Sequence, residues 1–415
     1  MRIAYIAQSY PPMISGAAIF VSELAEGMSA RGHQVLVIAA SDIEQPYIVE
    51  RENIKILRLR SFHNPMRVGQ RVLHYPRRDI LQALREFKPE IIHAHEPLIS
   101  WIGYEYARQV NIPITLTMHM LPWFVTALLP EIPGVRSLAE AATWIYVSLM
   151  ARKFTAIIAT TKTGSDAVKK MTGVQAEVIH CGINMQVFHP RLSSNVKADA
   201  RTRLNLPSKV PVILHVGRLD PEKRVDRIIQ ASAQAMRDTN AHLLIVGDGC
   251  EKPALVELSQ SLGIAERTHF PGYISVQEGL PDVYRMADLF VMASEIEAQG
   301  IVLLEAAAAG LPIAAVNATA ISEVVHDGIN GFLSEPGDVQ SLGNSIKTLL
   351  RSPKKSRQMG KESRSVAESY DIQHMQELHV QFYTKLIRRK RTLSTARIKR
   401  YAQWKRAKDW MRINK

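Results

Sequence analysis

The chain has 415 residues, of which 46% are hydrophobic and 22% are charged, as expected for a globular protein of two or three domains. Its two cysteines, Cys181 and Cys250, are too few for a disulfide framework and agree with a reducing cytoplasm. No apolar run reaches the roughly 18 residues that a membrane-spanning helix needs. The net charge of +13 is concentrated from residue 388 onwards, where twelve Lys or Arg stand against one Asp, which argues against a uniformly basic nucleic-acid binder.

Strands and helices alternate from the first residue. The pattern predicts a strand over 1–7, an amphipathic helix over 19–29 and a second strand over 35–40. This order is typical of a doubly wound α/β domain. Gly16, in the loop before the helix, either lets a phosphate approach the helix start or simply serves a turn. The loop lacks the GxGxxG pattern, which argues against a dinucleotide-dependent oxidoreductase.

Two further predicted strands, 90–95 and 114–119, each end in a histidine. The carboxyl end of a strand in such a sheet faces the ligand crevice, so His95 and His119 are expected there. No Asp, Glu or Cys cluster completes a metal site, and we therefore expect no metal. The favoured role of His119 is a hydrogen bond to a sugar hydroxyl.

The segment Met120–Pro130 is conspicuously apolar and includes Trp123 and Phe124. Core packing is the default interpretation, and a surface that dips into a bilayer or holds a lipid is the alternative. Helices are expected over 137–153 and 161–171.

The second half begins again with a strand, 210–216, that ends at a glycine. Arg218 and Lys223 bracket the loop between this strand and the next helix, where they are placed to clamp a diphosphate. Two surface salt bridges are the alternative, but the position of both residues in a turn after Gly217 favours the clamp.

The stretch Ser294–Pro312 organises this half. A buried strand over 288–294 precedes it, and a helix is expected over 301–309. The free backbone N–H groups at the helix start form an anion site. Glu297 lies in the turn and Glu305 one turn inside the helix. Glu297 as a solvated acid and Glu305 as a partner of a structural Arg remain alternatives, but an unpaired acid inside an apolar helix is costly to bury.

Four linked motifs carry a family resemblance: G-R-x-x-P-E-K over 217–223, G-D-G over 247–249, F-x-G-Y over 270–273, and two glutamates eight residues apart, Glu297 and Glu305. Together they resemble the retaining GT-B glycosyltransferases of group 1. This large family includes phosphatidylinositol mannosyltransferases, diacylglycerol glucosyltransferases and sucrose synthases. The resemblance covers roughly residues 1–387.

The resemblance implies a GT-B fold, in which two Rossmann-like doubly wound α/β domains face a central cleft. It places an acceptor-binding domain over 1–188 and a nucleotide-sugar-binding domain over 189–370. A helix over 371–387 is expected to cross back and complete the first domain. Residues 388–415 are expected to form a basic tail.

The resemblance also assigns residues. His119, Arg218, Lys223 and Glu297 would act at the reacting bond: His119 beside the donor sugar, the two cations on the diphosphate and Glu297 on the sugar. Glu305 would bind the ribose hydroxyls. The full donor-binding set would be Gly16, Gly217, Arg218, Lys223, Gly272, Tyr273, Glu297, Gly300, Ile301, Val302 and Glu305.

Four positions depart from the family pattern. Ala17 and Gln299 stand where the family often has Gly and Phe, the linker reads Cys181-Gly-Ile-Asn184, and the Gly-Gly often found ahead of Glu323 is absent. None belongs to the Arg, Lys and Glu set, but the first two bear on donor preference.

The implied activity is retaining, metal-independent transfer of a sugar from a nucleotide diphosphate donor, UDP- or GDP-linked, with no cofactor. The absence of a D-x-D motif agrees with this. The basic tail, with its aromatic residues, suits an anionic bilayer, although a disordered tail or RNA binding are alternatives. We therefore expect a lipid or lipid-linked acceptor, a role in glycolipid biosynthesis, and a cytoplasmic, peripheral membrane location. The competing functions are a non-catalytic nucleotide-sugar- or membrane-binding protein, or a nucleotide-sugar epimerase or hydrolase.

Overall fold

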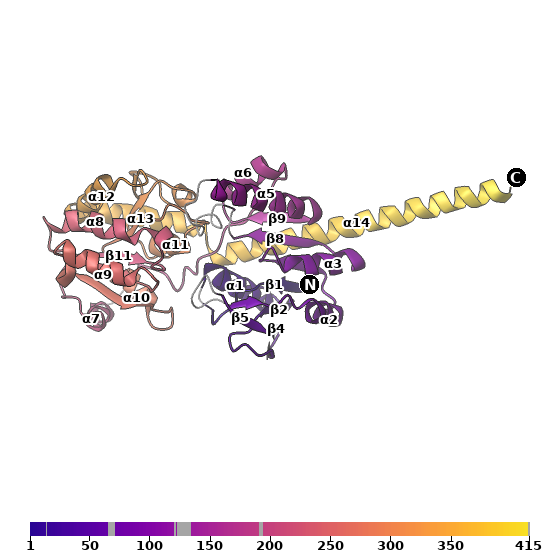
Figure 1. The fold of residues 1–415 in the computed structure, drawn as a ribbon, viewed down its shortest axis with the longest axis horizontal. Coiled ribbons are helices and arrows are strands. Elements are labelled where there is room, and N and C mark those ends of the chain that lie inside the picture. Colours follow the sequence, from indigo (N-terminus) through magenta and orange to yellow (C-terminus); the bar gives the residue numbers. More distant parts are fainter. Residues whose placement is uncertain (14, 65–70, 120–121, 123–133, 191–193, 414–415) are drawn as a thin grey trace.

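The computed structural model describes residues 1–413 except 14, 65–70, 120, 121, 123–133 and 191–193. Two α/β lobes lie side by side, and a long C-terminal helix runs from their junction along the first lobe and projects beyond it (Figure 1). None of the helices in the described ranges is long and apolar enough to cross a membrane.

The first lobe is built on an eight-stranded sheet of order β10-β9-β8-β7-β1-β2-β4-β3, parallel except for the β3–β4 pair. A separate hairpin, β5–β6, was not predicted, and neither was the edge strand β3. The elements are β1 (Arg2–Ile6), α1 (Gly16–Ala30), β2 (Gln34–Ala40), β3 (Tyr47–Arg51), β4 (Ile54–Leu59), β5 (Ser61–His63), β6 (Arg71–Leu73), α2 (Arg77–Phe87), β7 (Ile91–Ala94), α3 (Ser100–Val110), β8 (Ile114–Met118), α5 (Val135–Lys153), β9 (Ala156–Ala159), α6 (Lys162–Thr172) and β10 (Glu177–Val178).

The second lobe is built on a six-stranded parallel sheet of order β13-β12-β11-β14-β15-β16. Its elements are α7 (Ser194–Arg203), β11 (Val212–Val216), η1 (Pro221–Lys223), α8 (Val225–Met236), β12 (His242–Val246), α9 (Lys252–Ser261), η2 (Ala265–Arg267), β13 (Thr268–Gly272), α10 (Leu280–Met286), β14 (Leu289–Met292), α11 (Ile301–Ala308), β15 (Ile313–Val316), η3 (Ile321–Glu323), β16 (Gly331–Ser334), α12 (Val339–Arg351) and α13 (Pro353–Glu368).

The central strands of both sheets are buried along their whole length, as in β11, β12 and β14. Helices cover both faces of a parallel sheet, which explains why these strands are continuous apolar runs rather than alternating ones. The architecture confirms the predicted pair of doubly wound Rossmann-like domains.

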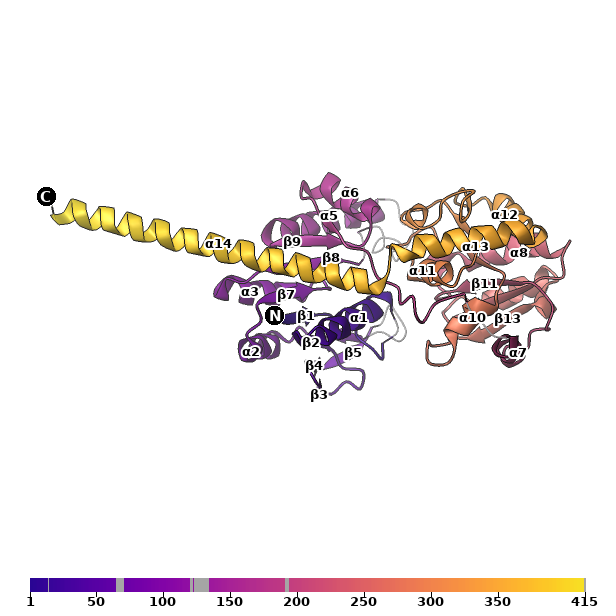
Figure 2. The same cartoon turned by 180° about the vertical axis from the view of Figure 1, so that it is seen from behind.

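The last helix, α14 (Ile372–Ile413), returns from the second lobe to the first, as predicted. Its residues Met375, Phe382 and Tyr383 share a buried cluster with Phe20 and Leu24 of α1, and Figure 2 shows the helix lying across this lobe. We expected the helix to end at residue 387 and a separate tail to follow. Instead one helix continues to Ile413, because no Gly or Pro interrupts the sequence from 372 onwards.

Candidate active site

The loops that the sequence singled out lie where each strand order reverses. In the first sheet, β1 lies between β7 and β2, so the loops after β1 and β7 diverge at their carboxyl ends. In the second sheet, β11 lies between β12 and β14, and the loops after β11 and β14 diverge in the same way. Ligands of open α/β sheets bind at such points. The second reversal brings the loop over 217–223 beside the turn that carries Glu297.

Lys223 and Glu297 are in direct contact at this point. Lys223 Nζ donates a hydrogen bond to Glu297 Oε1 at 2.6 Å, and both side chains are mostly buried. The Glu297 backbone is fixed in turn by Thr319, whose Oγ1 accepts from the Glu297 N–H at 2.9 Å. The residue predicted to bind the phosphate and the residue predicted to bind the sugar therefore form one ion pair.

Arg218 is held by two acids of its own loop. It is paired with Asp220, and its Nη2 donates to Glu222 Oε1 at 2.6 Å. Burial acts to raise the pKa of Glu222, but a backbone hydrogen bond and the neighbouring Arg218 outweigh it. The pKa of Glu222 is therefore lowered. A diphosphate that uses Arg218 must therefore displace or share these carboxylates. This arrangement was not predicted, since alternating charges in a turn are common.

A tightly packed pair of loops supports Arg218. A side chain at Gly247 would place its Cβ 1.8 Å from the carbonyl oxygen of Gly217, and one at Gly249 would reach 2.4 Å from that of Leu219. Gly247 also has a positive φ of 141°. Only glycine fits these positions. The G-D-G motif therefore acts by letting the loop after β12 pack against the loop that carries Arg218.

Helix α11 begins at Gly300, which has a positive φ of 72° and makes no side-chain cap. The N–H groups of the first helical turn, at Ile301 and Val302, have no partner within the helix, and both residues are partly exposed. This is the predicted anion-binding end. Tyr273, which follows Gly272 at the end of β13, is 49% exposed. Its partial burial raises the pKa of its hydroxyl, as do the charges of Glu278 and Glu305.

Glu305 lies one turn inside α11 and is buried. The sequence left open an Arg partner for Glu305, but among the described residues its side-chain partner is a tyrosine. Tyr284 of α10 donates a hydrogen bond from its hydroxyl to Glu305 Oε2 at 2.6 Å. Burial raises the pKa of Glu305 to about 7, and the Tyr284 hydrogen bond opposes that rise. One carboxylate oxygen thus has a fixed partner.

The two lobes meet at the start of α11. Gly16, at the start of α1, is so close to Ile301 that a Cβ on it would lie 3.2 Å from the Ile301 side chain. Two turns further along α1, Glu23 has a pKa raised to about 8 by burial and then by the charges of Glu305 and Glu26. Glu23 was not predicted, because an acid in an amphipathic helix normally faces solvent.

His119 follows β8, and its ring is hydrogen-bonded to the ring of His95. Their ring nitrogens, Nε2 of His119 and Nδ1 of His95, are 3.0 Å apart, so one donates to the other. Burial lowers the pKa of His119 to about 4 and that of His95 well below its usual value. Both rings are therefore neutral at physiological pH, which suits a hydrogen-bonding rather than an ionic role.

Two cross-lobe contacts were not predicted. Gln299 is buried, and its amide accepts from the Cys181 N–H at 2.7 Å and donates to the Cys181 carbonyl at 3.4 Å. Glu323 accepts from the backbone N–H groups of Lys162 and Thr163 at 2.9 and 2.8 Å, at the start of α6. Gln299 was noticed only as a departure from the family pattern. It ties the donor-side turn to the interdomain linker.

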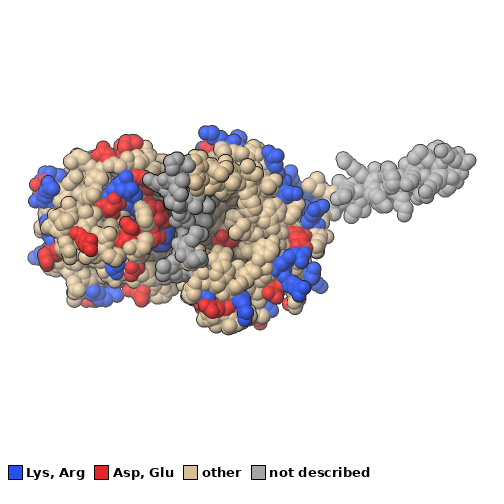
Figure 3. Space-filling view, in the orientation of Figure 1, with Lys and Arg blue, Asp and Glu red and all other residues tan. Residues whose placement is uncertain are grey.

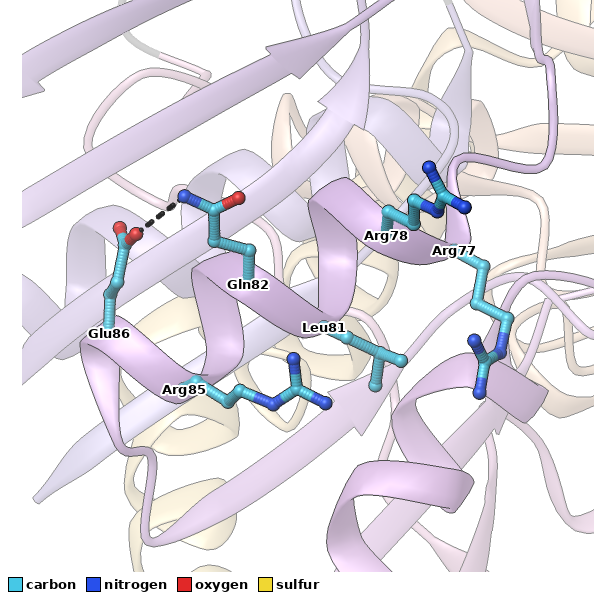
Figure 4. A pocket seen from close by; sticks show the side chains of 6 residues that line it. All are labelled: Arg77, Arg78, Leu81, Gln82, Arg85 and Glu86. Atoms are coloured by element: carbon cyan, nitrogen blue, oxygen red, sulfur yellow. Dashed lines mark hydrogen bonds between the residues drawn. The ribbon is translucent and has the colours of Figure 1, made fainter.

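The remaining predictions concern other parts of the chain. Within the part of the chain that the structure describes, no group of three or more His, Cys, Asp or Glu side chains is arranged to hold a metal. Most of the segment Met120–Pro130, including Trp123 and Phe124, lies outside the described residues, as do the side chains from Ser394 onwards. A depression on the exposed face of α2 is lined by Arg77, Arg78, Leu81, Gln82, Arg85 and Glu86, none of which belongs to the predicted site (Figure 4).

Comparison with known proteins places this geometry in a family. Residues 14–187 match the model described as Glycosyltransferase Family 4, and residues 196–366 match Glycosyl transferases group 1. An uncharacterized glycosyltransferase of Methanocaldococcus jannaschii is 26% identical over 355 residues, which cover 84% of this chain and 89% of that protein. The alpha-monoglucosyldiacylglycerol synthase of Acholeplasma laidlawii is 26% identical over 342 residues, or 80% and 84% of the two chains.

A solved structure of Anabaena HepE, in complex with UDP and glucose, is similar in fold. Its TM-score is 0.74 at 20% identity, with 93% of this chain and 100% of that chain covered. The two lobes, the switch-point loops and the family models agree. The chain belongs to the GT-B glycosyltransferases of group 1, and it is a glycosyltransferase.

Proposed function

We propose that the chain catalyses retaining, metal-independent transfer of a sugar from a nucleotide diphosphate donor to a membrane lipid or lipid-linked glycan. The observation that carries the proposal is the Lys223–Glu297 contact beside the start of α11. A cation, a helix N-terminus and an acid in one place fit a sugar joined to a phosphate, because the cation and helix dipole favour the anion while the carboxylate accepts from hydroxyl groups.

The donor would replace the internal ion pairs. Its diphosphate would take Lys223, Arg218 and the N–H groups of Ile301 and Val302. Its sugar hydroxyls would bind Glu297, and its ribose hydroxyls the free oxygen of Glu305. Gly16 would lie against the phosphate from the first lobe. HepE, which shares this fold, was solved with UDP, and this supports a UDP-sugar as the donor.

Transfer would break the bond between the anomeric carbon and the phosphate oxygen while the acceptor hydroxyl approaches from the same face. Negative charge grows on the leaving diphosphate, where Lys223, Arg218 and the α11 start are placed to stabilise it. The leaving phosphate oxygen would take the acceptor's proton, so no separate general base is required. Neutral His119 would hydrogen-bond the donor sugar beside the reacting carbon.

A lipid acceptor is supported by the resemblance to the Acholeplasma enzyme, whose name describes a glycolipid synthase. The test is nucleotide diphosphate release from UDP- and GDP-sugars, with and without diacylglycerol or phosphatidylinositol vesicles. We expect release to depend on one donor and to rise when a lipid acceptor is present, with a glycolipid of unchanged anomeric configuration as product. Donor binding without turnover would favour the non-catalytic alternative, and formation of an isomeric donor would favour an epimerase.

We also propose that residues 388–415 bind an anionic membrane surface and place the enzyme on the cytoplasmic face. The segment carries twelve basic residues and one acid, and basic residues near anionic lipid each contribute about 1 kcal/mol. Deletion of 388–415 is expected to weaken flotation with phosphatidylglycerol vesicles at low salt. The cut leaves Phe382, Tyr383 and Ile387 in the buried part of α14, so the fold should persist. Undiminished flotation would refute this role.

A further inference from the structure

A row of apolar side chains is exposed along α5, outside the candidate active site. Leu138, Ile145 and Leu149 are 74%, 64% and 49% exposed, and Val135 is 38% exposed. Ala142, also exposed, lies between them. Their spacing of three or four residues puts them on one face of the helix over a length of about 21 Å.

The opposite face of α5 is apolar as well. It buries Trp144, Val147, Met150 and Ala151 against the lobe. A helix that is hydrophobic on both faces normally lies inside a protein. Single exposed apolar residues are ordinary, but a continuous row of them marks an interaction surface.

The charges around this row are basic. Arg152 and Lys153, in the last turn of α5, are exposed, and Glu140 is the only acid in the helix. The neighbouring helix α6 exposes Lys169 and Lys170 in its own last turn. Since α5 and α6 both connect parallel strands of one sheet, their last turns lie at the same edge. Figure 3 shows the surface over these helices as mostly uncharged, with blue Lys and Arg along its upper border.

The row begins at the same end of the sheet as His119. Val135, its first residue, lies where β8 ends and where His119 follows. The row then runs toward the basic edge. A flat surface resting on α5 would therefore extend from the His119 side of the first lobe to that basic edge.

We propose that this face of α5 docks on the surface of an anionic bilayer, with Leu138, Ile145 and Leu149 inserted among the acyl chains and Arg152 and Lys153 at the headgroups. An apolar row flanked by Lys and Arg has the pattern of helices that lie in the membrane interface. Protein interfaces, in contrast, are depleted in Lys. The inference rests on the proposed lipid acceptor only for its biological purpose, because docking requires neither donor nor turnover.

The test is flotation of the full-length chain with vesicles of phosphatidylglycerol and phosphatidylcholine, at low salt and at about 0.5 M salt, where exposed charge interactions are screened. The double variant Leu138→Asp/Ile145→Asp is expected to lose the salt-resistant part of binding, by about tenfold or more. Ile145→Trp is expected to strengthen it, because Trp favours the interface. Ile329→Asp, at a 55% exposed position in the second lobe, is the matched control and should bind as the wild type does.

Wild-type flotation of the double variant at high salt would overturn the proposal. A change in oligomeric mass of that variant with unchanged flotation would also overturn it, since the row would then join two copies of the chain. Thermal stabilisation by nucleotide diphosphate should be equal in the double variant and the wild type. Failure of the wild type to transfer sugar to lipid would contradict the proposed function alone, and the vesicle flotation would still test the docking surface.

Discussion

Replacement of Lys223 by alanine is expected to lower kcat by a factor on the order of a hundred or more. Lys223 contacts Glu297 at 2.6 Å and is placed to follow the charge that develops on the leaving diphosphate. Its loss removes that stabilisation and leaves Glu297, which is 9% exposed, without its cation. The measurement is initial rate of nucleotide diphosphate release at saturating donor.

Lys347→Ala is the matched control for this change. Lys347 lies on α12 of the same lobe and pairs with Asp238, away from the switch-point loops. We expect its activity to be normal and the far-UV circular dichroism of both variants to match the wild type. Near-normal turnover in Lys223→Ala, with the fold retained, would contradict the site.

The sequence predicted the features that depend on local residue patterns, namely the strands, the helices and the loops between them. Strands that end in glycine or histidine, followed by helices, indicated the loops that face the ligand, and the motif glutamates indicated the start of α11. Because the carboxyl ends of parallel strands share an edge, loops 74 residues apart, those of Lys223 and Glu297, could be expected to meet. The approach of Gly16 to Ile301 was not predicted, although the family resemblance placed both residues in the donor-binding set.

Contacts that depend on how the two lobes come together could not be predicted from the sequence. Gln299 and Glu323 both bond backbone groups of the other lobe, and no periodicity marks a residue for such a partner. Tyr284 was equally hidden, because a Tyr in a short apolar helix is ordinary core until Glu305 is placed 2.6 Å from its hydroxyl. The polar partner of a buried acid is a property of tertiary structure, and sequence pattern gives only the acid.

Replacement of Glu305 by alanine is expected to remove most activity through weaker donor binding. Hydrogen bonds to a charged group contribute about 1.5–3 kcal/mol, so the loss of the ribose contact should raise the KM for donor roughly 10- to 100-fold. The fold should survive.

Because burial raises the pKa of Glu305 to about 7, the native state holds this proton more tightly than the unfolded chain does, and stability falls as pH rises from about 4.5 through 7. Glu305→Gln removes that loss and should not lower the melting temperature at pH 8.

The same pKa gives donor binding a pH dependence. Ribose hydroxyls donate to the ionised carboxylate, so wild-type affinity for donor should rise with pH around a midpoint near 7. Tyr284→Phe removes the hydrogen bond that favours ionisation, and the midpoint should move to higher pH. Glu305→Gln should abolish the transition, while Tyr104→Phe, in the first lobe, should leave it unmoved. Isothermal titration with a nucleotide-sugar donor, whose esterified diphosphate does not titrate between pH 6 and 9, measures all four proteins over that range. An unchanged midpoint in Tyr284→Phe would separate Tyr284 from the site, and a transition that persists in Glu305→Gln would assign the titration to Glu23, whose pKa is about 8.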